Sequence, residues 1–577
     1  MKRLLSIIVL IIGLYIVHAE EYPDLIKITT NKQTTPLNIN NRDLLGLNNA
    51  VSTQEIEVDN NVLFNSDIVS LTIGGENIIA DRINVVRNET KDYIYCAYES
   101  EDVEISISKL GNNIQGIING SSFGSYIIET INNSYLLVEL DSDETGSDGP
   151  SLEYDGDNLT LLESANNESS SATSSDIKYV RVLVMYTPDA LSLVSDMTNK
   201  VYQEINNGNT SFQNSGVNVR FELAYLGQTG DIEGIYTFNQ LLENFTNEGD
   251  GFADDVHILR ERYSADVCVL LVYNTDYCGL AWVNANKSSA FAVVRASSGC
   301  AGKYSFTHEI GHNAGCRHDT LVSPTTNPYQ YGHGYVHYTG TTSTSWRTMM
   351  AYGDACGGEA YCQRIKYWSN PAVNYDGNPT GDSTWCNNTR VWNENATRVS
   401  SFNTDPSSIT ITSADNSTYM DYACWHATQN ITASNYIVES GQTVEMIASS
   451  SITLLPGTTI KVGAKFRADI AFQSSNTSYP LFVPKQHNST EHSDDMNLSI
   501  KMSDDNLNIE LLLEEDCQNT TIRIYDIWGR LQKEIISNRK LLSGGHSFST
   551  NVSDLSNGIY LLVTQINGKS NTKKIII

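Results

Sequence analysis

Short stretches of alternating apolar and polar residues fill the early part of the chain. Residues 103–108 and 126–130 repeat with a period of two, as strands do when one face is buried. Asn, Gly and Asp, which favour turns, separate these stretches. From residue 20 to residue 140 the pattern therefore predicts a β-rich region.

Residues 141–176 differ because they are acidic and rich in Ser and Asn. A segment of this composition cannot bury enough apolar surface to order itself. We therefore predict a linker, and an exposed linker is a natural site of proteolytic processing.

From residue 177 onward, apolar strands alternate with helical stretches. Strands are predicted at 177–186, 217–226 and 267–273, and helices at 189–205 and near 252–262. Strands that alternate with helices indicate a mixed sheet in an α/β layer.

The last third of the chain returns to β-type patterns. Residues 431–469 form a ladder of short apolar pairs with Gly turns, which predicts a small stacked β module. Residues 471–504 are polar and predict a second linker. Period-two strands at 521–530 and 555–563 then predict a small antiparallel sandwich.

The first residues indicate export. Lys2 and Arg3 precede the apolar run 4–17, and Ala19 closes a small-residue sequence typical of a signal-peptide cleavage site. The run is too short to span a bilayer comfortably, so we expect no transmembrane segment in the mature chain.

Composition agrees with an extracellular protein of several domains. The 577 residues carry a formal net charge of −30, which disfavours nucleic-acid binding. Ten cysteines suit the formation of disulfides after export. A structural Ca²⁺ is compatible with so acidic a chain, although the sequence has no EF-hand loop.

The strongest chemical signal is the run Thr-His-Glu-Ile-Gly-His-Asn-Ala-Gly-Cys-Arg-His-Asp at 307–319. Residues four apart share one face of a helix, so His308 and His312 can present their imidazoles to one point. Gly315 allows a sharp turn at the helix end, which can bring back His318 as a third ligand. Three protein ligands with an open fourth position describe a catalytic zinc site.

Glu309 follows the first histidine and can direct its carboxylate at a water at the same point. Zinc would lower the pKa of that water from about 15.7 toward ~7. Glu309 would then take the proton as general base and return it to the leaving amine. Asp319, directly after the third histidine, is expected to brace the turn rather than bind zinc.

This run and the later sequence Trp-Arg-Thr-Met-Met-Ala-Tyr-Gly at 346–353 resemble the metzincin metallopeptidases. The resemblance implies a metzincin catalytic domain of α/β (α+β) type, with a twisted mixed sheet and a zinc helix. It implies that Met350, rather than Met349, lies beneath the zinc as an apolar floor. It also implies that Tyr352 reaches the metal or donates to the oxyanion.

Other segments resemble bacterial reprolysin-like and peptidyl-Asp-type members: 278–282, 298–300, 364–371 and 375–377. This resemblance implies a preference for cleavage beside acidic residues. It also implies that the strands before the zinc helix, from residue 278 to residue 295, include the edge strand with which an extended substrate pairs, although a buried strand there is the alternative.

Two disulfides are expected in this domain. The resemblance implies the pair Cys278–Cys300, and proximity in the chain suggests Cys356–Cys362. Cys96 is the only cysteine of the β-rich region, and three roles stay open for it. It could cap the zinc as a latency switch, lie buried and inert, or form another disulfide.

The end of the chain resembles the type IX secretion sorting domain of Bacteroidetes, through Tyr-Asp-Ile-Trp-Gly-Arg at 525–530 and Leu-Ser-Asn-Gly-Ile-Tyr at 555–560. It departs from that pattern in lacking a leading Pro-Asn-Pro segment and in ending with Ile577 rather than Lys. The resemblance implies recognition by the secretion machinery and a location outside the cell or on a Gram-negative outer membrane.

Together these features predict a secreted zinc-dependent endopeptidase made as a zymogen, which hydrolyses peptide bonds of extracellular proteins. Two alternatives stay open: an inactive, surface-exposed metzincin-like adhesin or binding module, and a zinc hydrolase that acts on a non-peptide amide. The expected segments are a signal peptide at 1–19, a β-rich pro-region at 20–140, a linker at 141–176, a catalytic domain at 177–403, a small β module at 404–470, a linker at 471–504 and a β-sandwich sorting domain at 505–577.

Overall fold

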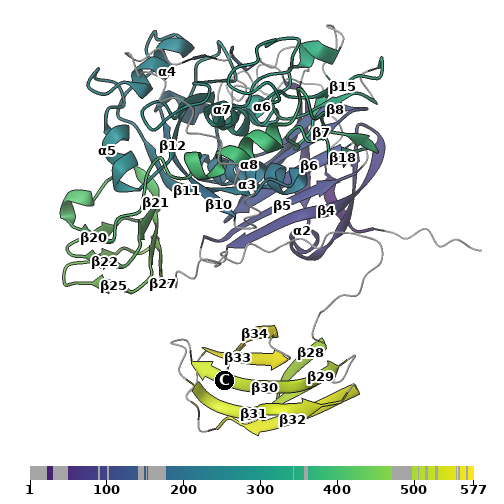
Figure 1. Cartoon of the computed structure of the whole chain (residues 1–577), viewed down its shortest axis with the longest axis vertical. Helices are drawn as coiled ribbons and strands as arrows, with labels where there is room; N and C mark the ends of the chain where they lie inside the picture. Colours follow the sequence, from purple (N-terminus) through teal and green to yellow (C-terminus); the bar gives the residue numbers. More distant parts are fainter. Residues whose placement is uncertain are drawn as a thin grey trace, which may run out of the picture. The chain divides into compact units, whose positions relative to one another are not determined.

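The computed structural model forms two compact units, residues 1–484 and residues 485–577, and each is described by itself (Figure 1). The predicted signal peptide and most of both predicted linkers lie outside the described residues. The structure describes residues 22–29, 50–88, 91–100, 103–140, 148–150, 152–153, 177–341, 344–356 and 362–470, and most of 497–576.

The β-rich region folds into a closed barrel in which β1 pairs with both β2 and β3. Alternate residues of its strands, such as Ile105 and Ile107, fill the barrel interior. The intervening polar residues Glu104 and Ser106 are also buried, because the strands carrying them pack against the next domain. The elements are β1 (Asp24–Ile28), β2 (Ala50–Val58), α2 (Asn60–Asn65), β3 (Ile68–Ile73), β4 (Glu76–Asn88), β5 (Tyr93–Glu99), β6 (Val103–Leu110), β7 (Asn113–Gly120), β8 (Gly124–Ile131) and β9 (Ser134–Leu140).

The next domain is built on an eight-stranded mixed sheet in the order β13-β14-β12-β10-β11-β21-β24-β27. Its strands β10, β11, β12 and β14 run parallel, and the short β13 pairs antiparallel to β14 at one edge. The strands are β10 (Lys178–Tyr186), β11 (Val219–Gln228), β12 (Val267–Val272), β13 (Gly279–Ala281), β14 (Phe291–Arg295), β21 (Met420–Ala427), β24 (Thr443–Ala448) and β27 (Lys465–Ile470).

Helices and short elements complete this domain, and three α-helices were not foreseen. Helix α4 begins with a capping box between Thr237 and Gln240, a local signal that could have identified it. The other unforeseen helices are α6 and α8. The helices are η1 (Asp189–Leu193), α3 (Met197–Ser215), α4 (Phe238–Thr246), α5 (Asp255–Arg262), α6 (Ser298–Ala301), α7 (Ser305–Ala314), η3 (Gly353–Cys356) and α8 (Asn388–Val399). The short strands are β15 (Val336–His337), β16 (Trp346–Arg347), β17 (Gln363–Arg364), β18 (Asn374–Tyr375) and β19 (Asn378–Pro379).

The helix expected at 189–205 is divided and shifted. A short 3₁₀ helix ends at Leu193, and α3 begins only after Asp196. The Asp196 carboxylate accepts a hydrogen bond from the Asn199 backbone N–H at 2.9 Å, which caps the new helix. Helix α3 then continues to Ser215, where Gly216 adopts a left-handed conformation and ends it.

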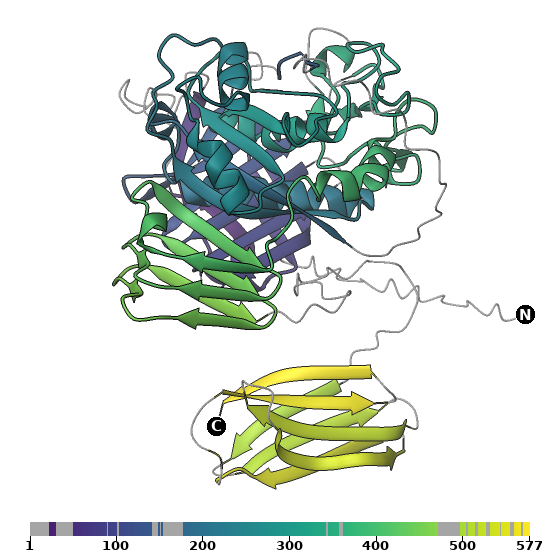
Figure 2. The same ribbon diagram turned by 60° about the vertical axis from the view of Figure 1, so that its left-hand side comes forward.

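Residues 404–470 were expected to form a separate module, but their strands continue the central sheet. Strand β21 pairs with β11, and β24 and β27 follow in order. Figure 2 shows the strands of this region in green as one stack. The remaining elements are β20 (Ser408–Ile411), η4 (Ser413–Asp415), β22 (Asn430–Ala433), β23 (Ile437–Val438), β25 (Ser451–Leu454) and β26 (Thr459–Ile460).

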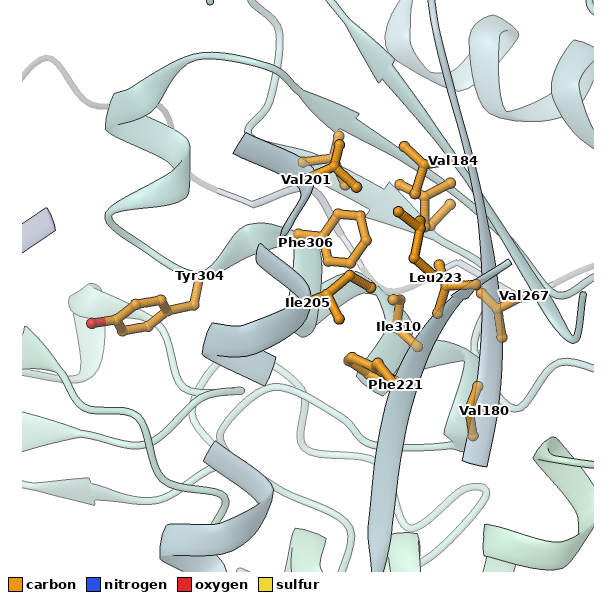
Figure 3. Packing of buried hydrophobic residues seen from close by; sticks show 14 of the residues in the cluster. Val180, Val184, Val201, Ile205, Phe221, Leu223, Val267, Tyr304, Phe306 and Ile310 are labelled. Atoms are coloured by element: carbon orange, nitrogen blue, oxygen red, sulfur yellow. The ribbon is translucent and has the colours of Figure 1, made fainter. Parts of the chain in front are cut away.

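One apolar core fixes helix α7 against the sheet (Figure 3). Side chains of α3 and α7 meet those of β10 and β11, and all are buried. Burial of each such side chain contributes about 1.5–3 kcal/mol. The residues are Val180, Val184, Val201, Ile205, Phe221, Leu223, Phe306 and Ile310.

The second unit contains two antiparallel sheets with a shared apolar core, in keeping with the predicted sandwich. Its strands are β28 (Asn497–Ser503), β29 (Asn506–Leu513), β30 (Cys517–Asp526), β31 (Leu531–Leu541), β32 (Gly544–Asn551), β33 (Ile559–Ile566) and β34 (Lys569–Ile576). Within the part of the chain that the structure describes, no helix is both long enough and apolar enough to cross a membrane.

Candidate active site

Helix α7 carries the His-Glu-x-x-His sequence and ends where the sequence predicts. Gly315 follows its last residue and adopts a positive φ of 109°, a conformation that glycine tolerates. The chain then reverses, and this turn returns His318 to the face of the helix that carries His308 and His312.

The three imidazoles converge on one point. His318 Nε2 lies 2.9 Å from His312 Nε2 and 3.1 Å from His308 Nε2, and all three rings are buried. Backbone carbonyls hold the opposite ring nitrogens: His308 Nδ1 lies 2.9 Å from the Met349 oxygen, and His312 Nδ1 lies 2.9 Å from the Cys316 oxygen. When each Nδ1 carries the proton, each Nε2 presents a lone pair, which is the arrangement that zinc requires.

Electrostatics agree with a metal site. Burial lowers the pKa of all three imidazoles, and that of His308 falls to about 4. The rings are therefore neutral at pH 7 and able to act as ligands. Three neutral nitrogen donors that face one point fit a zinc ion.

Glu309 lies beside the histidines and is also buried. Its Oε1 has no hydrogen-bond partner among the described residues, which is unusual for a buried carboxylate and fits a group that holds a water. Burial, and then the nearby charge of Asp148, raise the pKa of Glu309 well above its usual value. A Cβ at Gly279 would overlap this carboxylate, so glycine in β13 gives it room.

Met350 and Tyr352 both lie next to the residues of the histidine cluster. A Cβ at Gly311 would come within 2.8 Å of the Met350 sulfur, so Met350 packs directly against α7. The Tyr352 ring lies 4.1 Å from the His318 ring, centroid to centroid. Asp319 accepts a hydrogen bond from the Tyr352 backbone N–H at 2.9 Å and so braces this turn.

Comparisons with known proteins agree with this geometry. Residues 176–369 match the sequence profile of metallo-peptidase family M12. A peptidyl-Asp metalloendopeptidase of Stenotrophomonas maltophilia (strain R551-3) is 36% identical over 293 residues, which cover 50% of this chain and 67% of that protein. The chain belongs to metallo-peptidase family M12. It is a metalloendopeptidase, as the sequence predicts, and residues 503–577 match a secretion system C-terminal sorting domain.

Other relatives of this M12 peptidase have the same name. A peptidyl-Asp metalloendopeptidase of Xanthomonas campestris pv. campestris is 33% identical over 271 residues, which cover 46% of this chain and 62% of that protein. The chain thus spans about two thirds of these relatives' length. Among solved structures, a chain of a chaperone–substrate complex matches 49% of the peptidase and 38% of its own length, with 18% identity and a TM-score of 0.31.

Part of the predicted linker lies in the active site, which the sequence did not reveal. The Tyr352 hydroxyl donates to the backbone oxygens of Asp148, at 2.6 Å, and Gly149, at 2.5 Å. The Gly149 N–H donates to the Gly279 oxygen of β13 at 2.7 Å. Leu152 then forms a parallel bridge with Trp282, just beyond β13. The linker of the M12 peptidase therefore pairs with the edge of the sheet beside the histidines.

The Asp148 side chain enters a buried cationic pocket. Its carboxylate accepts a hydrogen bond from Ser305 Oγ at 2.6 Å and forms an ion pair with Arg364 Nη2 at 2.8 Å. Burial alone would raise the pKa of Asp148, but the charges of Arg364 and His308 and the hydrogen bonds from Ser305 and Arg364 together outweigh burial and hold the pKa well below the usual range. Burial, and then the nearby Arg347, lower the pKa of Lys303 at the same pocket to about 7.

The structure also bears on the cysteines of the peptidase. Disulfides join Cys278 to Cys300 and Cys356 to Cys362, which confirms both expected pairs. Cys96 lies in the barrel interior, where its Sγ donates to the Leu63 oxygen at 3.2 Å. Burial raises the pKa of Cys96 to about 11, so it is a thiol and not a thiolate at neutral pH. Of the three roles left open for it, this placement favours the inert one.

Proposed function

We propose that this M12 peptidase is a secreted zinc endopeptidase that cleaves peptide bonds of extracellular proteins beside acidic residues. The observation that carries the proposal is the convergence of three buried, neutral imidazoles next to the unpartnered carboxylate oxygen of Glu309. The preference for acidic residues is supported by the name peptidyl-Asp metalloendopeptidase that the relatives share.

In this proposal His308, His312 and His318 hold the zinc ion. Zinc in such a site supplies Lewis-acid chemistry, because it acidifies water and polarises a carbonyl oxygen. Glu309 takes a proton from the attacking water and delivers it to the leaving amine, which its position beside the imidazoles and the free Oε1 among the described residues support.

Other groups of the chain bind and orient the substrate. The Tyr352 hydroxyl donates a hydrogen bond to the oxygen that gains charge, since it already donates to two backbone oxygens in the cleft. The edge of β13, which residues 149 and 152 occupy in this structure, binds the substrate backbone as an added strand once that segment is displaced. Met350 supports the histidines from below.

The first test compares the full chain with Glu309→Gln and with Glu261→Gln as a matched control. Glu261 is on α5 and its side chain is 60% exposed. Zinc is expected near one ion per chain in all three proteins. Casein cleavage should fall by about 10²–10⁴-fold in Glu309→Gln only. A Glu309→Gln chain that cleaves casein normally would refute the role of Glu309.

Other outcomes separate the alternatives. Zinc in all three proteins with no cleavage of casein or of a peptide library, even after limited proteolysis of the predicted linker, would favour a binding module. Absence of zinc would refute the metal site itself. Cleavage of non-peptide amides without cleavage of peptides would favour the broader hydrolase.

The sorting domain supports export through a secretion machinery. We propose that the peptidase reaches the extracellular space or the outer surface of the cell by this route. A chain truncated after residue 502 should stay inside the producing cell, whereas the full chain should reach the medium or the cell surface.

A further inference from the structure

We infer that Arg364 and Ser305 form the pocket that selects an acidic substrate side chain, and that Asp148 occupies this pocket as a substrate mimic within the chain. The inference rests on the proposed endopeptidase function and adds to it the residues that read the substrate. It also assigns an inhibitory role to the described part of this segment, residues 148–150 and 152–153.

The backbone of this segment runs parallel to the edge strand β13 and occupies the edge along which a substrate backbone would be added. Gly149 bonds to β13 through its N–H, and the Leu152 oxygen accepts from the Val283 N–H at 2.8 Å. The backbone oxygens of Asp148 and Gly149 both accept from the Tyr352 hydroxyl. Tyr352 is the proposed oxyanion donor, so the peptide bond beside the acidic residue lies at the reacting position.

The fit at Gly149 is close. A Cβ there would come within 2.7 Å of Leu280 Cδ1 and 3.0 Å of the Gly279 oxygen. Glycine at this position therefore lets the segment approach the edge strand. Any larger residue would push it away from the cleft.

The pocket is built for a carboxylate and not only for Asp148. Arg364 donates from Nη1 to the Lys303 oxygen at 2.6 Å and from Nη2 to the Ala351 oxygen at 3.2 Å, which fixes its guanidinium independently of the linker. Its side chain is 3% exposed and that of Asp148 is 1% exposed. The buried ion pair is charge-assisted and hydrogen-bonded on both sides.

Departure of Asp148 would leave the Arg364 guanidinium without a carboxylate partner, held only by the Lys303 and Ala351 carbonyls. A buried charge without its partner is costly, so the pocket would then favour another carboxylate. An acidic substrate side chain provides one. An amide or apolar side chain of similar size does not.

The same contacts make the segment inhibitory while the linker is intact. It occupies the edge of β13, the Tyr352 hydroxyl and the acidic pocket at once. The last residue, Glu153, contributes little, because it is 73% exposed although it pairs with Arg317. Glu153 therefore serves as a matched control for Asp148.

The first experiment measures the initial rate of cleavage of an Asp-containing fluorogenic peptide by the intact full chain, with integrity checked on a gel. Asp148→Ala should raise the rate about tenfold, because it removes the charge-assisted contact. Gly149→Ala should raise it similarly without a change in the pocket. Glu153→Ala should stay within about twofold of wild type. Equal rates for all four chains would overturn the inhibitory role.

The second experiment tests the pocket by comparing peptides that differ only in Asp or Asn beside the scissile bond. The Asp148→Ala chain should prefer the Asp peptide by about 100-fold in kcat/KM. Adding Arg364→Gln should reduce this preference to about threefold, with little change for the Asn peptide, and Arg364→Lys should restore part of it. If Arg364→Gln does not fold, Ser305→Ala should lower the preference by about tenfold.

A binding measurement gives a readout that does not depend on turnover. A synthetic peptide of residues 145–154 should bind the Asp148→Ala chain that also carries Glu309→Gln. The same peptide with the substitution Asp148→Asn should bind about tenfold more weakly. Equal binding of the two peptides would overturn the pocket assignment.

Two outcomes separate the pocket from the proposed function. Cleavage of Asp and Asn peptides at equal rates would overturn the pocket assignment but would not contradict the proposed endopeptidase function. Cleavage of no peptide would instead refute the proposed function.

Discussion

The Tyr304 hydroxyl donates a hydrogen bond to the Glu104 carboxylate at 2.9 Å and so joins the barrel to the residue that precedes helix α7. Both side chains are buried. Asn119 of the barrel adds a bond to the Gly302 oxygen at 3.0 Å, and the Lys366 N–H donates to Glu104 at 2.7 Å. The barrel therefore contacts the chain on both sides of the acidic pocket.

We expect Tyr304→Phe to lower the free energy of unfolding of the first unit by about 1–3 kcal/mol, because it removes the donor to one oxygen of the buried Glu104 carboxylate and leaves only the Lys366 N–H on the other. Urea denaturation followed by tryptophan fluorescence would measure this change. Tyr419→Phe, at an exposed tyrosine, is the control and should have little effect. Equal stability of the two variants would contradict the importance of the Tyr304–Glu104 contact.

The stability of the first unit should depend on pH through Glu129 of β8. This carboxylate accepts from Ser298 Oγ at 2.5 Å and Ser195 Oγ at 2.8 Å, and it faces Gln115 and the charge of Lys200. Burial raises the pKa of Glu129 above its usual 4.5. The folded chain thus binds this proton more tightly than the unfolded chain does.

This contribution to stability is fully present below about pH 4.5 and is lost as the pH rises through the raised pKa. Glu129→Gln keeps a neutral side chain at every pH. Between pH 5 and pH 8 the wild-type Tm should therefore fall more than that of Glu129→Gln, in matched scanning calorimetry. Glu243→Gln, at an exposed position of α4, should behave like wild type.

Removal of zinc should destabilise the domain as well as stop cleavage. A ligand present at 1,000 times its Kd stabilises the folded state by about 4 kcal/mol. A chelator should therefore lower the Tm of the wild-type chain, and added Zn²⁺ should restore it. His318→Ala should have a low Tm that the chelator does not change. A wild-type Tm that is indifferent to the chelator would count against the metal site.

Helix α7 packs against Met350 and Trp368 at Gly311. A Cβ there would come within 2.8 Å of both the Met350 sulfur and Trp368 Cη2. Gly311→Ala should therefore cost about 1–3 kcal/mol through overpacking, despite the better helix propensity of alanine. Gly230→Ala, where a Cβ meets nothing within 4 Å, is the control and should stay within about 0.5 kcal/mol of wild type.

The sequence predicts the histidine geometry because that geometry is local. The spacing of His308 and His312 follows from the pitch of a helix, and Gly315 marks its end. The period-two pattern likewise predicts the barrel strands. It does not predict that Ser106 is buried, because the polar face of an isolated strand has the same pattern as one covered by another domain.

The acidic pocket could not be predicted, because its parts come from distant segments. The composition of residues 141–176 predicts a linker that includes Asp148, and that prediction is sound for a segment without partners. Its order depends on Arg364 and Ser305, which only the folded chain brings near it. Arg364 lies in a segment that resemblance had singled out, but no pattern there indicated a role in binding.

The pairing of β21 with β11 affects how fragments of this peptidase can be made. A fragment that ends at residue 403 would retain the histidines but would lose the strand that covers one edge of β11. An exposed edge in the middle of a sheet is a template for intermolecular pairing, so such a fragment should aggregate. A fragment that extends to residue 470 keeps this edge covered and retains all eight strands of the sheet, so it is the better piece to produce on its own.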